Sequence, residues 1–446
     1  MFGDTRMTSG RRRASAALCL VAALGLSGCT ARGHDGFAPR LGAGPGAAQS
    51  TASASPTAAS SSLTPQGASS AGTDPAAPRT SAGATPGSSP PVKPASTSAV
   101  SGVADPLPGM PLADDAANIY NHDGANMLSP VVAGFPNLVY VPNSNSNTVD
   151  VINPSTGAIV EHFAVPAQPQ HVVPSYDLKT LWVNSDIGNA LTPINPATGL
   201  PGKPIAVADP YNLYFTPDGK YALVMAERLH RIDWRDPTTM ALIHTTPVPC
   251  SGVNHADFSA DGRYFIVSCE FDGRVLKIDT LTKQIVGVMR LTPDAMPQDV
   301  KVSPDGKVFY IADMQSNGVW EIDGDTFKKI GFLPTGKGAH GLYVSRDASL
   351  MYVTNRGEGS ISVVDLATRT VKTTWRIPGG GSPDMGGLSV DGMQLWVSGR
   401  YNGVVYEIST VDGHLIKKIK VGSGPHGLCV YPQPGRYSLG HTGVFR

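Results

Sequence analysis

A pattern of short apolar segments occurs seven times along about the last three hundred residues, and it constrains the fold more than any other feature. In the clearest copy, Leu350–Asn355 is followed by Ile361–Asp365. A period of about 40–45 residues with several strands per unit is typical of the blades of a β-propeller. The equivalent apolar positions, whose numbers differ by 42, 41, 43, 44, 42 and 44, are Val141, Val183, Val224, Val267, Ile311, Val353 and Val397.

One repeat shows how each blade is predicted to contain four strands. Alternating residues predict an inner strand at Asp299–Val302, a second strand at Val308–Ala312 and a third at Val319–Asp323. The outer strand follows at Lys328–Leu333. Between the first two strands, Ser303–Gly306 forms a turn in which the proline fixes its own φ and the glycine accepts a positive φ.

The two ends of the repeat array indicate how the ring closes. The first unit, Leu138–Val165, contains a second, a third and an outer strand but no inner strand. An additional inner strand is predicted near the end of the chain, at Pro425–Val430. That strand can complete the first blade and leave no open sheet edge. We therefore predict an all-β, seven-bladed propeller of four-stranded blades over residues 116–446, with an eighth blade on Met127–Ala133 as the alternative.

The repeats resemble those of the YVTN-repeat β-propellers. The tetrad itself is present as Tyr352-Val353-Thr354-Asn355, and the resemblance covers about Asn118 to Arg446. It implies a propeller of the kind found in exported bacterial proteins and archaeal surface-layer proteins. The propellers of nitrous-oxide reductase, which carries copper, and of cytochrome cd1 nitrite reductase, which carries haem d1, are related in architecture. The chain lacks the Cys-x-x-Cys-His motif of covalent haem attachment, and no second cupredoxin or cytochrome domain is recognisable.

The first 28 residues are predicted to be a lipoprotein signal peptide. Arg11–Arg13 form a positive segment, and Ala14–Leu26 form an apolar segment too short to span a bilayer. Leu26-Ser27-Gly28-Cys29 resembles the bacterial lipobox, in which the cysteine is lipidated. We therefore expect an exported protein, anchored to the cell membrane by a lipid on Cys29 and facing the periplasm or the cell exterior. An ordinary signal peptide is the alternative.

Residues 29–115 are predicted to form a disordered tether. The stretch Gly42–Ala113 consists almost entirely of Ser, Ala, Thr, Pro and Gly, and it lacks aromatic residues. Such a segment cannot bury enough apolar surface to offset its ordering entropy. The whole chain has a formal net charge of zero, which argues against a nucleic-acid partner. We expect a monomer.

Alignment of the repeats places several polar residues at one end of the central channel, the channel mouth. Two groups of loops meet there: those that enter the inner strands and those that follow the second strands. Four of the eleven histidines occupy equivalent positions in the first group. The predicted ligand-binding residues are His171, His255, His340, His426, Asp299, Asp384, Arg356 and Arg400.

These residues leave several functions open. The four histidines are candidate ligands for copper or another divalent metal, because imidazole binds such ions. The same mouth is suited to a polar small molecule, a peptide or a protein. Arg356 with Arg400 suggests a basic notch for a carboxylate or phosphate, and pairing of these arginines with local acids such as Glu358 is the alternative. The histidines are equally suited to hydrogen bonding with backbone. We favour a binding module; the alternative is a metal-dependent redox or lyase-type enzyme. Glu227 or Glu270 with His255 is a candidate set for the lyase type. A structural cell-envelope protein whose loops contact polymer is a third alternative. His34, His122 and His441 lie outside the repeats and receive no role.

The five cysteines fall into different classes. Cys250 lies before an inner strand and Cys269 ends the paired second strand, so both map to the same end of one blade. An exported protein matures in an oxidising compartment, which favours a Cys250–Cys269 disulfide; two free thiols are the alternative. Cys429 lies in the closing inner strand and is expected to be a small buried hydrophobe.

Overall fold

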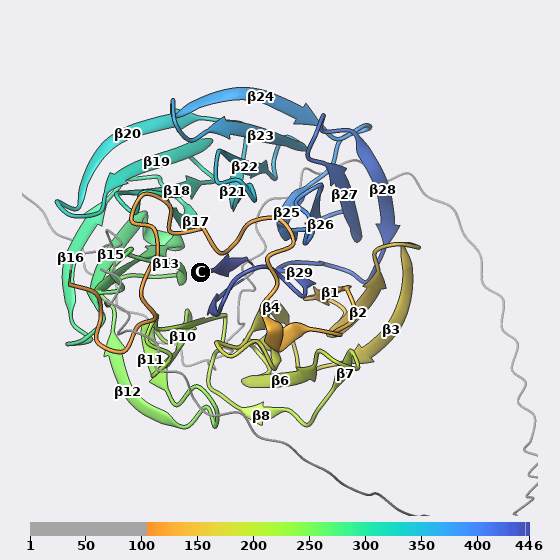
Figure 1. Ribbon diagram of the computed structural model, residues 1–446, viewed down its shortest axis with the longest axis horizontal. Helices are drawn as coiled ribbons and strands as arrows, with labels where there is room; N and C mark the ends of the chain where they lie inside the picture. The colour runs from red at the N-terminus through yellow and green to blue at the C-terminus, as the bar shows by residue number, and fades with distance from the viewer. Residues whose placement is uncertain (1–104, 442) are drawn as a thin grey trace, which may run out of the picture. The chain divides into compact units, whose positions relative to one another are not determined.

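The computed structural model describes residues 105–441 and 443–446, and in them seven antiparallel sheets surround a central channel (Figure 1). The helical elements of this part of the chain are two single turns of 3-10 helix, η1 (Pro130–Val132) and η2 (Glu270–Asp272). No helix among the described residues is long and apolar enough to cross a membrane. The predicted signal peptide, Cys29 and most of the predicted tether lie outside the described residues.

Blades 4 to 7 each contain four consecutive strands. Blade 4 consists of β13 (Val253–Phe258), β14 (Tyr264–Cys269), β15 (Arg274–Asp279) and β16 (Ile285–Arg290). Blade 5 consists of β17 (Pro297–Val302), β18 (Val308–Asp313), β19 (Gly318–Asp323) and β20 (Lys328–Pro334). Blade 6 consists of β21 (Ala339–Val344), β22 (Leu350–Asn355), β23 (Ser360–Asp365) and β24 (Thr370–Arg376). Blade 7 consists of β25 (Pro383–Leu388), β26 (Gln394–Gly399), β27 (Val404–Ser409) and β28 (Leu415–Lys420).

Each of blades 1 to 3 differs from this plan in at least one strand. Blade 1 consists of β29 (Cys429–Tyr431), β1 (Leu138–Asn143), β2 (Thr148–Asn153) and β3 (Ala158–Ala164). Blade 2 consists of β4 (Pro169–Pro174), β5 (Leu181–Ser185), β6 (Ala190–Asn195) and a broken outer strand, β7 (Leu200–Pro201) and β8 (Ile205–Ala206). Blade 3 consists of β9 (Asn212–Phe215), β10 (Ala222–Ala226), β11 (Arg231–Arg235) and β12 (Leu242–Pro247), followed on its inner edge by β30 (Ser438–Gly440) and β31 (Val444–Phe445).

The predicted closure of the ring is confirmed. β29 pairs with β1, with Val430 opposite Val139. The regular strand starts at Cys429, later than predicted, because the residues before it lie between two blades. Gly427 donates its backbone N–H to the carbonyl of Gln170, and its own carbonyl accepts from Val172 N. The closing segment therefore joins blade 1 to blade 2. The alternative eighth blade is wrong, since Met127–Ala133 contains only η1 and isolated bridges.

A hairpin that the repeats did not predict fills part of the channel. We call residues 438–445, with strands β30 and β31, the C-terminal hairpin. Gly440 pairs with Tyr214 on the inner strand of blade 3, and the chain ends at the centre of the ring (Figure 1). Leu439, Val444 and Phe445 are almost fully buried, and the preceding Tyr437 stacks on Tyr176. Burial of these apolar side chains holds the hairpin in place.

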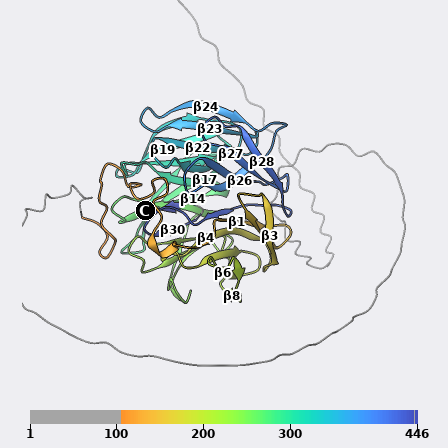
Figure 2. The ribbon, with the colours of Figure 1, turned by 45° about the vertical axis from the view of Figure 1, so that its right-hand side comes forward.

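The segment before β1 crosses one face of the ring (Figure 1 and Figure 2). It bonds to the turns that join inner and second strands: Leu107 N donates to Asp261 O at 2.7 Å, and Ile119 N donates to Pro304 O at 2.9 Å. Tyr120 donates its hydroxyl to the carbonyl of Val302, 2.7 Å away. The segment therefore lies against the inner-strand ends at this face, and the histidines lie toward the other end of the inner strands.

Buried polar contacts connect neighbouring inner strands. Asp257 in blade 4 accepts the backbone N–H of Val302 in blade 5 at 2.9 Å, and Asp299 accepts that of Leu342 in blade 6 at the same distance. Tyr343 accepts the N–H of Gly386. Because each contact crosses a blade boundary, the inner strands keep a fixed spacing around the channel.

Candidate functional site

A β-bulge at the start of five inner strands positions the aligned polar residues. The register shifts by one residue in β4, β13, β17, β21 and β25. A bulge places two residues opposite one and re-aims a side chain locally. In each blade the shift lies at or beside the position predicted from the alignment: His171, His255, Asp299, His340 and Asp384.

Five histidines lie together in the channel, and we call them the histidine cluster: His171, His255, His340, His426 and His441. The ring centroid of His171 is 4.8 Å from that of His426, 5.2 Å from that of His441 and 5.5 Å from that of His255. None of the five is more than 2% exposed. His441, which lies outside the repeats, joins this cluster because the C-terminal hairpin carries its ring into the channel.

His171 presents an unpaired ring nitrogen. Its Nδ1 lies 3.0 Å from the carbonyl oxygen of Tyr211, and a carbonyl only accepts, so Nδ1 carries the proton. Nε2 is buried and has no hydrogen-bond partner among the described residues. Burial lowers the pKa of His171 to about 3, which keeps the ring neutral. Gly427 is needed beside it, since a Cβ there would lie 2.1 Å from Cδ2 of His171.

His255 has the same arrangement, fixed by a longer chain of contacts. Its Nδ1 lies 3.1 Å from Oδ1 of Asn254, which also accepts from Ser268. The amide of Asn254 donates in turn to Oε2 of Glu270 at 2.8 Å. Nε2 of His255 is left buried without a partner in the described part of the chain. Burial, with His171 nearby, holds the pKa of His255 well below its usual range.

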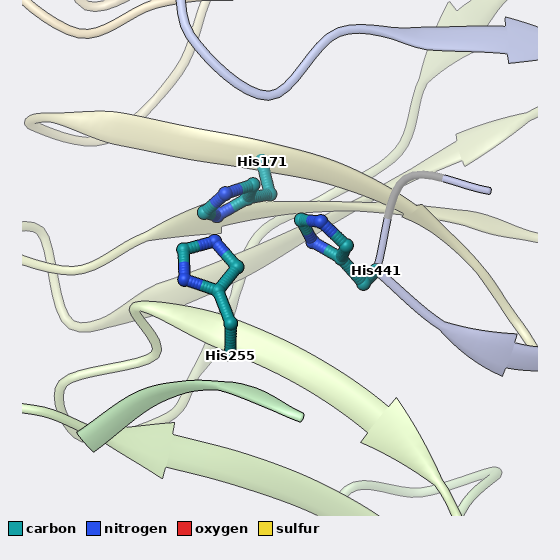
Figure 3. Close-up of side chains that lie close together, drawn as sticks. All are labelled: His171, His255 and His441. Atoms are coloured by element: carbon teal, nitrogen blue, oxygen red, sulfur yellow. The ribbon is translucent and has the colours of Figure 1, made fainter. Parts of the chain in front are cut away.

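His441 completes a group of three with His171 and His255. One ring nitrogen from each lies within 4.8 Å of the others, and the three rings face a common space (Figure 3). Nδ1 of His441 is 3.0 Å from the amide nitrogen of Asn212, and Nε2 is 3.5 Å from a carboxylate oxygen of Asp299. Asp299 was predicted to line the channel mouth, but its side chain is fully buried next to His441.

The other two histidines belong to a second group with Asp384. Nδ1 of His340 lies 3.1 Å from Asp384 Oδ1, while its Nε2 accepts from Arg356 at 3.2 Å. His426 donates from Nδ1 to Gln170 at 2.9 Å, and its Nε2 lies 3.7 Å from Asp384 Oδ2. Both ring nitrogens of His340 and Nδ1 of His426 thus have protein partners. The four histidines predicted as one metal set are divided between two groups.

The two arginines predicted to bind a ligand lie against the second group. Arg356 is 3.2 Å from Asp384 Oδ1, and Arg400 is 4.0 Å from Oδ2. Arg400 also donates to the hydroxyl of Ser144 at 2.9 Å. With side chains only 12% and 11% exposed, both arginines lie against Asp384, and Arg356 also against His340, instead of forming an open notch. Burial raises the pKa of Asp384, although both arginines oppose that effect.

The sequence matches a family of known propellers, described as the YNCE-like beta-propeller, over residues 123–435. The chain belongs to the YNCE-like beta-propeller family. The resemblance to repeat propellers seen in the sequence is thereby confirmed. No curated protein matches the chain.

Solved structures share the fold of this YNCE-like propeller at low sequence identity. Hydrazine synthase of Kuenenia stuttgartiensis is 19% identical, with a TM-score of 0.55 over 62% of this chain and 93% of that one. The dihydro-haem d1 dehydrogenase NirN is 14% identical, with a TM-score of 0.51 over 66% and 75%. A functionally unknown protein from Desulfotomaculum acetoxidans is 16% identical, with a TM-score of 0.56 over 66% and 98%. Such similarity shows the fold alone.

Two buried carboxylates of the YNCE-like propeller, those of Glu227 and Glu270, lie close to each other near the histidines. Burial, with Glu270 nearby, raises the pKa of Glu227 well above its usual range, and burial also raises the pKa of Glu270. Oε1 of Glu227 has no hydrogen-bond partner among the residues described. Glu270 reaches His255 through Asn254, so this carboxylate, one of the two considered as metal ligands, is placed as an outer partner of the imidazole.

The disulfide considered from the sequence is present in the structure. Cys250 and Cys269 are bonded, with 6.0 Å between their Cα atoms. Glu270 directly follows Cys269, and Asn254 follows Cys250 after three residues, so the bond joins the two segments that hold His255 in place. Cys429 is buried and unbonded in β29.

Proposed function

We propose that the protein is a metal-binding module, in which Nε2 of His171 and Nε2 of His255 hold a transition-metal ion inside the channel. The observation that carries this proposal is the pair of buried ring nitrogens, each with a free lone pair and no hydrogen-bond partner among the described residues. A buried polar atom without a partner costs about 1–3 kcal/mol, so such pairs are uncommon unless something occupies the space between them.

The protonation of these rings supports a cation as the occupant. A metal ion binds the neutral form of imidazole, and burial keeps both rings neutral. On each ring the other nitrogen, Nδ1, is committed to an oxygen acceptor, as is usual for metal-binding histidines. Imidazole ligands suit Zn²⁺ and Cu²⁺ in particular.

The spacing of the rings fits an ion after a small inward movement. Zn–N bonds of about 2.0–2.1 Å in a tetrahedral site place ligand nitrogens roughly 3.4 Å apart. The three nitrogens of His171, His255 and His441 lie within 4.8 Å of one another, so the rings must close on the ion.

Metal content tests the proposal directly. Protein purified without chelators, and then titrated with Zn²⁺ in competition with a chromophoric chelator, should bind one equivalent tightly. Because an ion that binds only the folded state stabilises it, unfolding should require about 2.7 kcal/mol more at a free concentration of 100 Kd. The absence of stoichiometric metal, together with an unchanged Tm after addition of Zn²⁺ and Cu²⁺, would show that the channel holds no cation.

We further propose that this module works outside the cytoplasm, attached to the membrane by a lipid on Cys29. The disulfide supports this location, because such bonds persist in oxidising compartments. In a bacterial host, the wild-type protein should incorporate labelled fatty acid and sediment with membranes. The Cys29→Ser variant should lose the label and appear in the soluble extracytoplasmic fraction. Equal labelling of both proteins would contradict lipidation at Cys29.

A further inference from the structure

The position of His441 depends on the C-terminal hairpin and on no repeat. The strand pairing between the hairpin and blade 3 is one residue pair, Gly440 with Tyr214, and the N–H of His441 donates to the carbonyl of Leu213 at 2.9 Å. The hydroxyl of Ser438 donates to the carbonyl of Pro174 in blade 2 at 3.0 Å. Its far end is tied by Arg446, which lies 2.8 Å from Asp257. A change in how the hairpin docks would therefore move the His441 ring relative to His171 and His255, which the blades hold.

The other two imidazoles of the cluster, those of His340 and His426, belong to the second group with Asp384. Nε2 of His340 accepts from Arg356, and Nδ1 of His426 faces Gln170. A positively charged guanidinium beside His340 also opposes a cation there. At His441, Nδ1 lies 3.0 Å from the amide nitrogen of Asn212 and Nε2 lies 3.5 Å from a carboxylate oxygen of Asp299, the type of group that orients metal-binding imidazoles. The ring therefore has to exchange one of these contacts for the ion.

We propose that the C-terminal hairpin carries the third metal ligand, His441, so that cation binding and docking of the hairpin strengthen each other. The inference rests on the proposed metal site. When two events share an interaction, the factor by which one favours the other is the same in both directions. The ion should therefore hold the hairpin in the channel by the same factor as the docked hairpin raises the affinity for the ion.

Two glycines in the hairpin provide a matched test of this coupling. Gly440 and Gly443 have similar positive φ values, +98° and +94°. A Cβ at Gly440 would lie 2.4 Å from the carbonyl oxygen of Leu213 and 2.5 Å from Cα of Tyr214, whereas a Cβ at Gly443 would meet nothing within 4 Å. Gly440→Ala thus displaces the hairpin without removing a ligand, and Gly443→Ala controls for the backbone strain.

The experiment compares Zn²⁺ affinity in the full-length wild type and in the variants Gly440→Ala, Gly443→Ala and His441→Gln. Because removal of an outer partner of a ligand already costs 10–100-fold in affinity, His441→Gln should weaken binding by about tenfold or more. Gly440→Ala should also weaken binding, and Gly443→Ala should bind more tightly than Gly440→Ala. In the wild type, Zn²⁺ should slow hydrogen exchange at residues 437–446, and His441→Gln should abolish that effect.

The outcomes separate this inference from the metal site itself. If His441→Gln and Gly440→Ala bind Zn²⁺ as tightly as the wild type does, His171 and His255 hold the ion without the hairpin, and the inference is overturned while the metal site stands. If Zn²⁺ binds the wild type but leaves exchange at residues 437–446 unchanged, the coupling is also overturned. If the wild type binds no cation, the metal site and the inference fail together.

Discussion

Replacing His171 and His255 together by glutamine is expected to weaken Zn²⁺ binding by more than about 100-fold, because the change removes both unpaired ring nitrogens. Glutamine keeps a polar side chain of similar length, so the double variant should still fold. The measurement is a competition titration against a chelator of known affinity, with the folded state checked by circular dichroism.

The second histidine group supplies the control for this experiment. The double variant His340→Gln, His426→Gln changes two equally buried histidines in the same channel, but their ring nitrogens contact Asp384, Arg356 and Gln170. It should lose some stability and retain stoichiometric metal. Loss of metal from the control alone would reverse the assignment and place the ion beside Asp384.

Removal of the disulfide is expected to produce the largest change in stability. The bond spans 19 residues of sequence, and closing a loop of that size stabilises a protein by about 3 kcal/mol in the chain-entropy model. The double variant Cys250→Ala, Cys269→Ala should therefore lower the free energy of unfolding by about that amount. Urea unfolding, followed by tryptophan fluorescence, measures the difference.

The free thiol of Cys429 is the matched control. It is as buried as the bonded cysteines, so Cys429→Ala removes a similar volume from the core without opening a covalent loop. Its cost should be smaller, about 1 kcal/mol. Equal losses from the two variants would mean that packing at Cys250 and Cys269, and not the covalent bond, accounts for the effect.

The sequence predicted the blades well because each repeat carries its own strand and turn pattern. The predicted strand Val308–Ala312 corresponds to β18 at Val308–Asp313, for example. The alignment also identified one polar position per blade. The alignment could not identify the contacts of each residue. His171 and His340 are equivalent in the repeat, but Nε2 of His171 has no hydrogen-bond partner among the described residues, whereas Nε2 of His340 accepts from Arg356.

His441 shows a different limit of repeat-based prediction. It follows the last repeat, and its place in the channel depends on a hairpin that pairs with an inner strand at Gly440 and Tyr214. The sequence does contain large apolar and aromatic residues after the last repeat, which indicate that this segment is buried: Tyr437, Leu439, Val444 and Phe445. The alignment also did not show that Arg356 and Arg400 share Asp384, which lies in β25, the inner strand of blade 7.

The shared construction of blade 1 has a consequence for the rate of folding. Its inner strand, β29, and its second strand, β1, are separated by almost the whole propeller in sequence. Pairings between such distant segments form late, because a long loop must close first. Until then β1 presents an unpaired edge, which can pair with another chain. Folding intermediates of this protein should therefore be most prone to aggregate through blade 1, at rates that rise with protein concentration.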